Sequence, residues 1–214
     1  MQECILCGSR EVDNVDPVSP LIYLHCPQCD LIFLEEDFRL APEDEKKHYE
    51  THENTLDNPG YVQLFEKFIA GAVRPYIDGG RALDYGSGPG PVLKVLLERS
   101  GFSAETYDPF FAPQSPQGSF DLVTCTEVME HVYTPREMLG KLCSLLPEGG
   151  VLALMTHFHP GREAFPRWWY HKDPTHVTFF SAQTFRWIAE NLPLQMLYSD
   201  GENTVTFRKG PNQK

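Results

Sequence analysis

Three glycines spaced two residues apart, Gly86, Gly88 and Gly90, stand between two segments of different character. Residues 81–85 before them are predicted to form a buried strand, and residues 91–100 after them carry apolar side chains at the spacing of one helix face. Glycine permits a tight turn and lets a ligand approach the backbone closely. In open α/β sheets, ligands bind beyond the carboxyl ends of the strands, which is where this loop would lie.

Strand-like and helix-like segments alternate through residues 76–214. Further strands are predicted at 104–107, 121–125 and 151–156, further helices after Thr134 and Ser181, and a closing antiparallel pair at 194–198 and 204–208. The central strands are continuously apolar, as in sheets that are covered on both faces. The pattern therefore predicts an α/β fold with a Rossmann-like, mainly parallel sheet.

Four cysteines form two Cys-x-x-Cys pairs near the N-terminus, and the pairs consist of Cys4 with Cys7 and Cys26 with Cys29. Each pair is a turn that presents two thiolates to one centre, and this arrangement is typical of a zinc ribbon with tetrahedral sulfur coordination. Four thiolates leave no open position for a substrate, so the zinc ion would be structural. A redox-active pair is the alternative, which the duplication of the motif disfavours.

The ribbon is expected to span residues 1–38 and to need its metal in order to fold, because so short a segment has little core of its own. Loss of Cys29 is expected to unfold the ribbon without affecting the glycine loop. A helical connector is predicted at 39–75, before a main domain at 76–214. Side chains of the connector that could cover a ligand site are Tyr49, His52, Asn54 and Tyr61.

Two acidic residues indicate which ligand the glycine loop favours. Asp84 precedes the loop by two positions, and Asp108 ends the second predicted strand. A carboxylate at Asp84 would repel a pyrophosphate but suits a cationic amino-acid group, and one at Asp108 can accept hydrogen bonds from ribose hydroxyls. Pro91 stands where a dinucleotide-binding loop would favour a third glycine. An adenosine with a cationic, phosphate-free tail therefore fits better than NAD or ATP.

Three motifs, in the same order as in the family, resemble those of the class I S-adenosylmethionine-dependent methyltransferases. They are residues 83–90 at the loop, 120–132 around the third predicted strand and 146–152 at a glycine turn after a helix. The resemblance covers residues 80–208 and implies that S-adenosylmethionine is the methyl donor. The cofactor contacts that it implies are Asp84, Gly86, Ser87, Gly88, Gly90, Asp108, Thr124, Cys125, Thr126 and Glu127.

One segment departs from the family pattern. Only residues 109–119 separate Asp108 from Phe120, where the family usually has a helix, another strand and an acid that contacts adenine. The segment is rich in proline and too short for both elements. A sheet reduced in this middle segment is therefore expected, with Phe110 or Phe111 stacking on the adenine.

Three side chains are candidates for activating the methyl acceptor. Glu130 and His131 follow the strand predicted at 121–125, and His176 ends an aromatic loop after the next strand. A general base helps where the acceptor begins as a hydroxyl or a protonated amine, and His176 is the preferred base. Structural hydrogen bonds are the alternative role for these groups. The four histidines of the aromatic loop and Asp173 could also build a second metal site, but their spacing matches no tight metal-ligand pattern.

Composition narrows the choice of acceptor and location. The formal net charge of -12 and the scattered basic residues disfavour a nucleic-acid partner. No apolar run approaches the roughly 20 residues of a membrane span, and the N-terminus lacks the features of a signal peptide, so a cytoplasmic protein is expected. The expected function is methylation of a small molecule at oxygen, nitrogen or carbon. The alternatives are RNA or protein methylation with the ribbon as a docking module, and a non-catalytic binding module.

Overall fold

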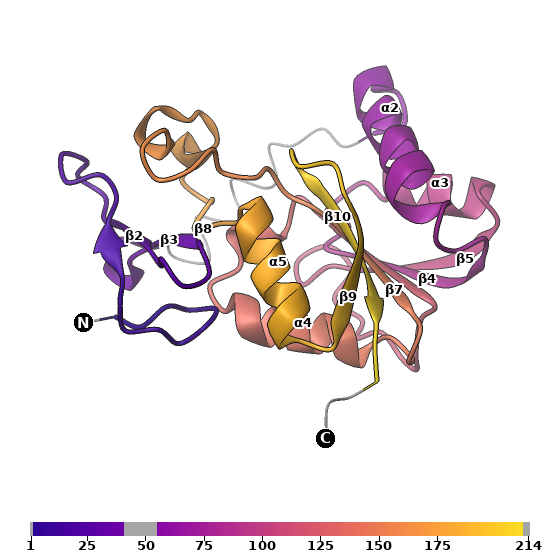
Figure 1. Ribbon diagram of the computed structural model, residues 1–214. Coiled ribbons are helices and arrows are strands. Elements are labelled where there is room, and N and C mark those ends of the chain that lie inside the picture. The colour runs from indigo at the N-terminus through magenta and orange to yellow at the C-terminus, as the bar shows by residue number, and fades with distance from the viewer. Residues whose placement is uncertain (1, 41–54, 212–214) are drawn as a thin grey trace.

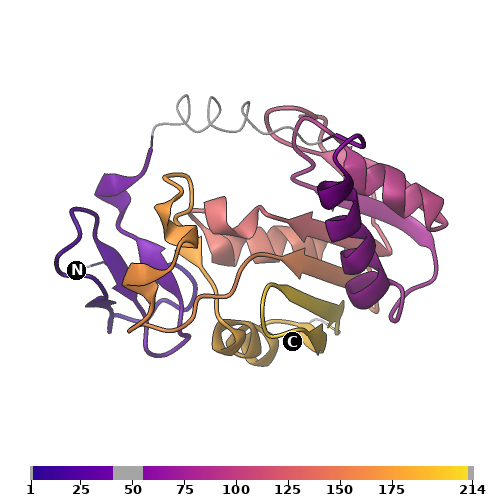
Figure 2. The ribbon, with the colours of Figure 1, turned by 90° about the horizontal axis from the view of Figure 1, so that it is seen from above.

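The structure is a computed structural model that describes residues 2–40 and 55–211 (Figures 1 and 2). Within these residues the larger sheet has the spatial order β5 (Phe102–Tyr107), β4 (Gly80–Tyr85), β6 (Leu122–Thr126), β7 (Val151–Met155), β10 (Thr204–Lys209) and β9 (Leu194–Ser199). The first four of these strands are parallel, and β10 is antiparallel to both of its neighbours. The predicted Rossmann-like, mainly parallel sheet is confirmed.

Helices cover both faces of this sheet, as Figure 1 shows. They are α2 (Pro59–Phe68), which continues as a π-helical turn at Ile69–Val73, α3 (Val92–Arg99), α4 (Pro135–Ser144) and α5 (Ala182–Asn191). Successive residues of a strand point to opposite faces, so each strand serves two cores. Ala82 belongs to the core under α2 and α3, whereas its neighbour Leu83 belongs to the core under α4 and α5. The strands are therefore apolar throughout.

The middle segment is reduced, as the sequence indicates. Between β5 and β6 the chain makes a single bridge, Asp108 to Ala112, and no helix or strand. As a result β5 forms the edge of the sheet, and Ser103 and Glu105 on it are exposed. β5 lies on one side of β4, and the next strand in sequence, β6, lies on the other side. This change of direction opens a crevice at the carboxyl end of β4.

A second, smaller sheet combines three N-terminal strands with a short strand from the segment after β7. Its order is β1 (Asp13–Asn14), β2 (Tyr23–His25), β3 (Ile32–Leu34) and β8 (Thr178–Phe179). Ile32 is paired with Phe179 and Phe33 with Thr178. The predicted ribbon at 1–38 therefore has its sheet completed by a strand of the predicted main domain. Figures 1 and 2 both show the segment around β8 beside the N-terminal strands.

Packing also joins the two predicted domains. Phe33 and Leu31 lie in the same core as Leu83, whereas Ile32 lies in a separate core with Phe165. All three residues of β3 are buried, because both of its faces are covered. The boundary predicted at residue 38 is thus not a boundary in packing.

The predicted connector at 39–75 contains α2, whose first turn is capped by the Asn58 side chain. Tyr61 lies in this turn, whereas the other three connector residues proposed to cover a ligand, Tyr49, His52 and Asn54, lie outside the described residues. Among the helices of the described ranges, none is long and apolar enough to cross a membrane.

Candidate active site

The glycine loop lies at the crevice, directly after β4. Gly86 has a φ of +83°, and a Cβ atom there would collide with the side chain of Val128. The backbone N–H of Gly86 donates to the Tyr107 carbonyl at 2.7 Å, which ties the loop to the end of β5. Gly88 also has a positive φ, of 63°. This geometry requires glycine, because side chains rarely adopt left-handed conformations.

Backbone N–H groups donate hydrogen bonds to both carboxylate oxygens of Asp108. Its Oδ2 accepts a hydrogen bond from the N–H of Gly88 at 3.0 Å, and its Oδ1 accepts from Phe110 and Phe111 at 2.8 and 3.0 Å. The residue is 7% exposed. A carboxylate offers about four lone-pair sites, so three N–H donors leave capacity for a further donor such as a ribose hydroxyl.

Asp84 is also buried, but only a weak donor supports it. The Thr124 hydroxyl lies 3.4 Å from its Oδ1 and 3.3 Å from the Leu83 carbonyl. Burial and the nearby charge of Asp108 raise the pKa of Asp84 to about 7, although the Thr124 hydrogen bond opposes the shift. A cation placed beside Asp84 would favour the ionised form and lower this pKa again.

A cavity of about 740 Å³ extends from the glycine loop to the end of β7. The predicted site residues that line it are Asp84, Gly86, Ser87, Gly88, Gly90, Asp108, Thr126, Glu127, Glu130, His131 and His176. Thr124 and Cys125 do not line it, because both are fully buried inside β6 and only the last residue of that strand, Thr126, reaches the cavity. Thr124 instead contacts Asp84 through its hydroxyl group.

Several cavity residues were not among the predicted contacts. They include Tyr61, Tyr107, Lys141, Met155, His157 and Asn203. The sequence indicates Tyr61 as a residue that could cover a ligand site. Lys141 lies in α4 and Asn203 in a turn, and the sequence patterns of these segments predict secondary structure but no contact with a ligand. The ammonium group of Lys141 lies 5.3 and 5.1 Å from the ring centroids of Tyr85 and Tyr107. Phe110 and Phe111 also line the cavity, beside Asp108.

Two carboxyl groups, the buried Glu130 and the half-buried Glu127, share a hydroxyl at the other end of the cavity. The Tyr170 hydroxyl donates to Glu130 Oε1 at 2.6 Å and lies 3.2 Å from Glu127 Oε2. Burial and the charge of Glu130 raise the pKa of Glu127 well above its usual value. Glu127 adopts a φ of 53°, which is uncommon outside glycine and costs of order 1 kcal/mol. Strain of this kind at a cavity wall is typical of functional sites.

Two histidines lie next to these acids. The ring centroids of His131 and His176 are 4.8 Å apart. Nδ1 of His131 lies 3.0 Å from the Thr175 carbonyl, and Nδ1 of His176 lies 2.8 Å from the Tyr170 carbonyl. Burial and the charge of His131 lower the pKa of His176, which keeps its ring neutral at pH 7. The structure thus brings all three candidates for acceptor activation to one end of the cavity.

A family profile described as a methyltransferase domain matches residues 60–199. The chain belongs to this methyltransferase-domain family. It is a methyltransferase, and S-adenosylmethionine is the methyl donor of the family. The profile match begins well after the four N-terminal cysteines, so the ribbon lies outside the matched region.

Solved structures are similar to this chain at low sequence identity. The N-methyltransferase NodS from Bradyrhizobium japonicum WM9, in complex with S-adenosyl-L-homocysteine, is 14% identical with a TM-score of 0.49, and the match covers 78% of this chain and 97% of NodS. Magnesium protoporphyrin IX methyltransferase from Synechocystis PCC 6803 is 16% identical with a TM-score of 0.47, and the match covers 69% and 81%. No curated protein matches the sequence significantly.

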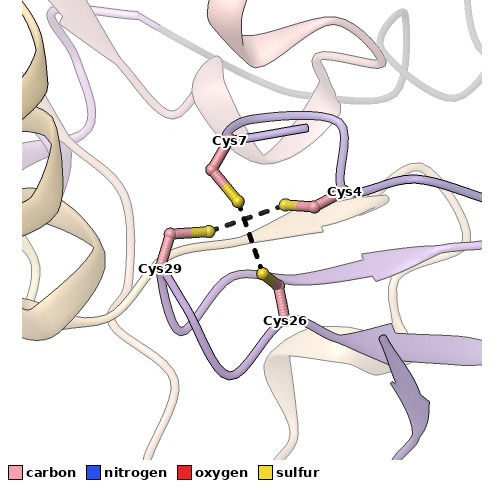
Figure 3. Close-up of side chains that lie close together, drawn as sticks. All are labelled: Cys4, Cys7, Cys26 and Cys29. Carbon is pink, nitrogen blue, oxygen red and sulfur yellow. Dashed lines mark hydrogen bonds between the residues drawn. The ribbon is translucent and has the colours of Figure 1, made fainter. Parts of the chain in front are cut away.

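The N-terminal cysteines of the methyltransferase converge on one point (Figure 3). Sγ atoms of Cys4 and Cys29, and those of Cys7 and Cys26, are 3.5 Å apart, and all four lie within 4.8 Å of one another. These separations are too long for disulfides, whose sulfurs are about 2.05 Å apart. They are close to the roughly 3.8 Å expected between sulfurs that share one zinc ion at 2.3 Å.

Ionisation of these thiols is strongly unequal. A hydrogen bond from Cys29 lowers the pKa of Cys4 to about 5, whereas burial raises the pKa of Cys7 to about 12. The hydrogen bond to Cys4, together with burial, raises the pKa of Cys29 far above its usual value. Further thiolates in so small a volume require a cation to offset their repulsion.

Proposed function

We propose that the protein transfers a methyl group from S-adenosylmethionine to a small-molecule acceptor. The observation that carries this proposal is a single cavity that joins the glycine loop and Asp108 at one end to Glu130, His131 and His176 at the other. Its volume of about 740 Å³ falls in the range of small-molecule sites. The net charge of -12 argues against an RNA acceptor.

The cofactor end is assigned by charge and hydrogen-bonding capacity. Asp84 suits the cationic methionine part, and the remaining acceptor capacity of Asp108 suits a ribose hydroxyl. Phe110 and Phe111, which follow Asp108 and Pro109, are placed to stack on the adenine in place of the acid that the shortened segment lacks. When bound, S-adenosylmethionine supplies a methyl group on a sulfonium, which an acceptor displaces in line.

The acceptor end works mainly by alignment and by exclusion of water. Glu130, which lines this end, is fully buried, and the Tyr170 hydroxyl donates to its carboxyl group at 2.6 Å. We assign activation of the acceptor to Glu130, His131 and His176, because the donor atoms of these three side chains lie within 4.8 Å of one another at this end. The Nδ1 atoms of both histidines face carbonyl oxygens, so in each neutral ring Nε2 carries the lone pair that can receive a proton or bind a cation.

The four N-terminal cysteines are proposed to hold a structural zinc ion. Support comes from the sulfur separations of 3.5 Å and from a donor set of four thiols, which suits tetrahedral zinc. Three of the four cysteines are buried in the main core, so the ion would stabilise the fold directly and have no open position for a substrate. The same burial argues against a freely projecting docking module.

Asp108 provides the sharpest test of the cofactor assignment. Isothermal titration with S-adenosylmethionine should show binding that Asp108→Ala weakens roughly a hundredfold, because charge-assisted hydrogen bonds are worth about 1.5–3 kcal/mol. Glu98→Ala removes the same charge from the exposed side of α3 and should leave the affinity unchanged. Absence of binding in the wild-type protein would contradict the proposed function.

Transfer of a tritiated methyl group into fractionated cell extract tests the acceptor class. Label in the small-molecule fraction is expected. Label in RNA or in protein would overturn the small-molecule assignment while leaving the methyltransferase chemistry intact.

A further inference from the structure

Glu130, His131 and His176 form a second cluster of metal-ligating groups, distinct from the cysteines, and their donor atoms all lie within 4.8 Å of one another. We propose that the acceptor end of the cavity binds a divalent first-row transition-metal ion through these three side chains. The site deepens the proposed function and rests on it in one respect, namely that this cavity is where the methyl acceptor binds.

The orientation of both imidazole rings supports this site. A carbonyl oxygen cannot donate, so the contacts of the two Nδ1 atoms with the carbonyls of Thr175 and Tyr170 place the ring protons on Nδ1. Nε2 is then the nitrogen through which each ring would coordinate an ion. Histidines that bind metals nearly always donate their other N–H to a carbonyl or carboxylate in this way, which fixes the ring for coordination.

The carboxyl group of Glu130 supplies an independent observation. The side chain is fully buried, and its Oε1 accepts the hydrogen bond from Tyr170 at 2.6 Å. Among the described residues its Oε2 has no hydrogen-bond partner, although it is buried at the cavity wall. A buried carboxylate oxygen without a partner is costly, and a cation bound at Oε2 would remove that cost.

The three ligands are held together by the backbone. Val177 donates its N–H to the carbonyl of Glu130 at 2.8 Å, which attaches the loop that carries His176 to the turn that carries Glu130 and His131. Asp173 accepts hydrogen bonds from the N–H and the hydroxyl of Thr175 at 2.9 and 2.6 Å, and Thr175 in turn orients His131. Ligands from two distant segments are thus positioned before any ion binds.

The donor set indicates the kind of ion. Two imidazoles and one carboxylate suit Mn, Fe, Co, Ni or Zn as divalent ions and are unlike the all-oxygen sites of Ca²⁺. Bonds of about 2.1 Å at right angles place neighbouring donors about 3 Å apart, which small side-chain rotations within the 4.8 Å cluster can reach. Three protein ligands leave coordination positions for an acceptor, and all three side chains line the cavity.

An open cation site next to a methyl donor favours an acceptor with an oxygen that can bind the ion, such as a hydroxyl. Binding to the ion would lower the pKa of that hydroxyl, so that it would lose its proton to water as it enters the site, before methyl transfer. The oxygen then forms a bond to the methyl carbon as the carbon–sulfur bond breaks, and the electron pair of that bond remains on sulfur as a neutral thioether. The ion is neither oxidised nor reduced. The imidazoles then act as ligands and not as the proton acceptor.

Manganese is a suitable probe, because Mn²⁺ prefers oxygen and nitrogen donors, whereas the thiol cluster suits zinc. Protein loaded with one equivalent of zinc, which the four thiols bind in preference to harder donors, is titrated with Mn²⁺ alone. The free Mn²⁺ ion is followed by its electron paramagnetic resonance signal. One Mn²⁺ per chain is expected to bind, and pulsed spectra of the bound ion should show coupling to imidazole nitrogen. Absence of binding at millimolar Mn²⁺, or bound Mn²⁺ without nitrogen coupling, would overturn the proposal.

Variants assign the ligands. Glu130→Gln and His176→Ala should each weaken Mn²⁺ binding at least tenfold, whereas His157→Ala, which alters a histidine of the same cavity outside the cluster, should leave it unchanged. Equal Mn²⁺ affinity in all three variants and the wild type would contradict the assignment. Circular dichroism checks folding, and if a variant fails to fold, the nitrogen coupling in the wild-type protein remains decisive.

Calorimetric titration with S-adenosylmethionine on the same samples separates the two proposals. Protein that binds S-adenosylmethionine but no Mn²⁺ would keep the proposed function and lose the metal site. Protein that binds Mn²⁺ at the cluster but no S-adenosylmethionine would keep the metal site and lose the proposed function.

Discussion

Asp84 and Asp108 show how two identical side chains at one cavity acquire different properties. Asp108 accepts three backbone hydrogen bonds, whereas Asp84 is buried beside one distant hydroxyl. Burial therefore raises the pKa of Asp84 to about 7, close to physiological pH. Both positions could be identified from the sequence, but this difference could not, because it depends on donors that the folded backbone brings to one carboxylate and withholds from the other.

The raised pKa of Asp84 predicts that cofactor affinity depends on pH. Below pH 7 the free protein holds this side chain mainly in its neutral form, and a cationic ligand favours the ionised form. Affinity for S-adenosylmethionine should therefore increase roughly tenfold between pH 5.5 and 7, a range in which an α-amino group stays charged. Calorimetry across this range measures the effect.

The matched control is Asp84→Asn, which should bind S-adenosylmethionine more weakly and with little pH dependence in the same range. A flat pH profile in the wild-type protein would show that Asp84 does not face the cationic part of the ligand.

At the level of elements, the turn after β6 contacts the glycine loop after β4. Val128 occupies the space that a side chain at Gly86 would need, and Glu127 adopts its unusual φ immediately before it. The two turns therefore determine each other's shape. Sequence patterns could predict β4, β6 and the loop, because these depend on local apolar periodicity. They could not predict that Thr124 and Cys125 stop short of the cavity, since that depends on where β6 ends relative to its neighbours.

Gly86→Ala should disrupt this contact between turns. The new methyl group meets Val128, and the residue must keep a left-handed conformation, so we expect a loss of about 2 kcal/mol in the free energy of unfolding and at least a tenfold loss of cofactor affinity. Gly140→Ala is the control, because it lies in α4 with open space around it and should gain about 0.5–1 kcal/mol. Chemical denaturation and calorimetry compare the two. Equal stability in both variants would contradict the proposed tight approach.

For the whole molecule, the ribbon and the catalytic fold share one structure. Asp30, next to Cys29, accepts hydrogen bonds from the ring of His25 at 2.8 Å and from the Ser181 hydroxyl at 2.6 Å, and Ser181 caps α5. The backbone carbonyl of Asp30 lies 2.7 Å from Nε2 of His159. Although burial opposes it, hydrogen bonds from His25 and Ser181 lower the pKa of Asp30, so its contribution to stability is lost only in acid, as the pH falls through that lowered pKa.

Loss of the proposed zinc ion should therefore affect the acceptor end of the cavity. Cys29→Ser should increase hydrogen exchange in β2 and β3, and also around residues 170–180, because β8 pairs with β3 and His176 lies just before it. This differs from the expectation from sequence that only the ribbon would unfold. Cys143→Ser, at a buried cysteine distant from the cluster in sequence, is the control and should not change exchange at 170–180. Exchange confined to the ribbon in Cys29→Ser would restore the view of an independent module.

The sequence predicted the zinc motif because four cysteines at regular spacing form a local signal. The Glu130, His131 and His176 cluster has no such signal, since forty-four residues lie between its last two members and only folding brings them together. The segment of β8 is strand-like in sequence, because residues 177–180 are all β-branched or aromatic. Its pairing with β3 had no such signal, since so short a segment has no periodicity that would indicate a partner.

The pairing of β3 with β8 has a consequence for synthesis on the ribosome. β3 leaves the exit tunnel early, whereas its partner at Thr178–Phe179 is translated only near the end of the chain. During most of translation the nascent protein would display Ile32, Phe33 and Leu34 on an unpaired edge, which favours association with other chains. Early binding of zinc by the cysteines would hold the turn before β3 in place until β8 is translated.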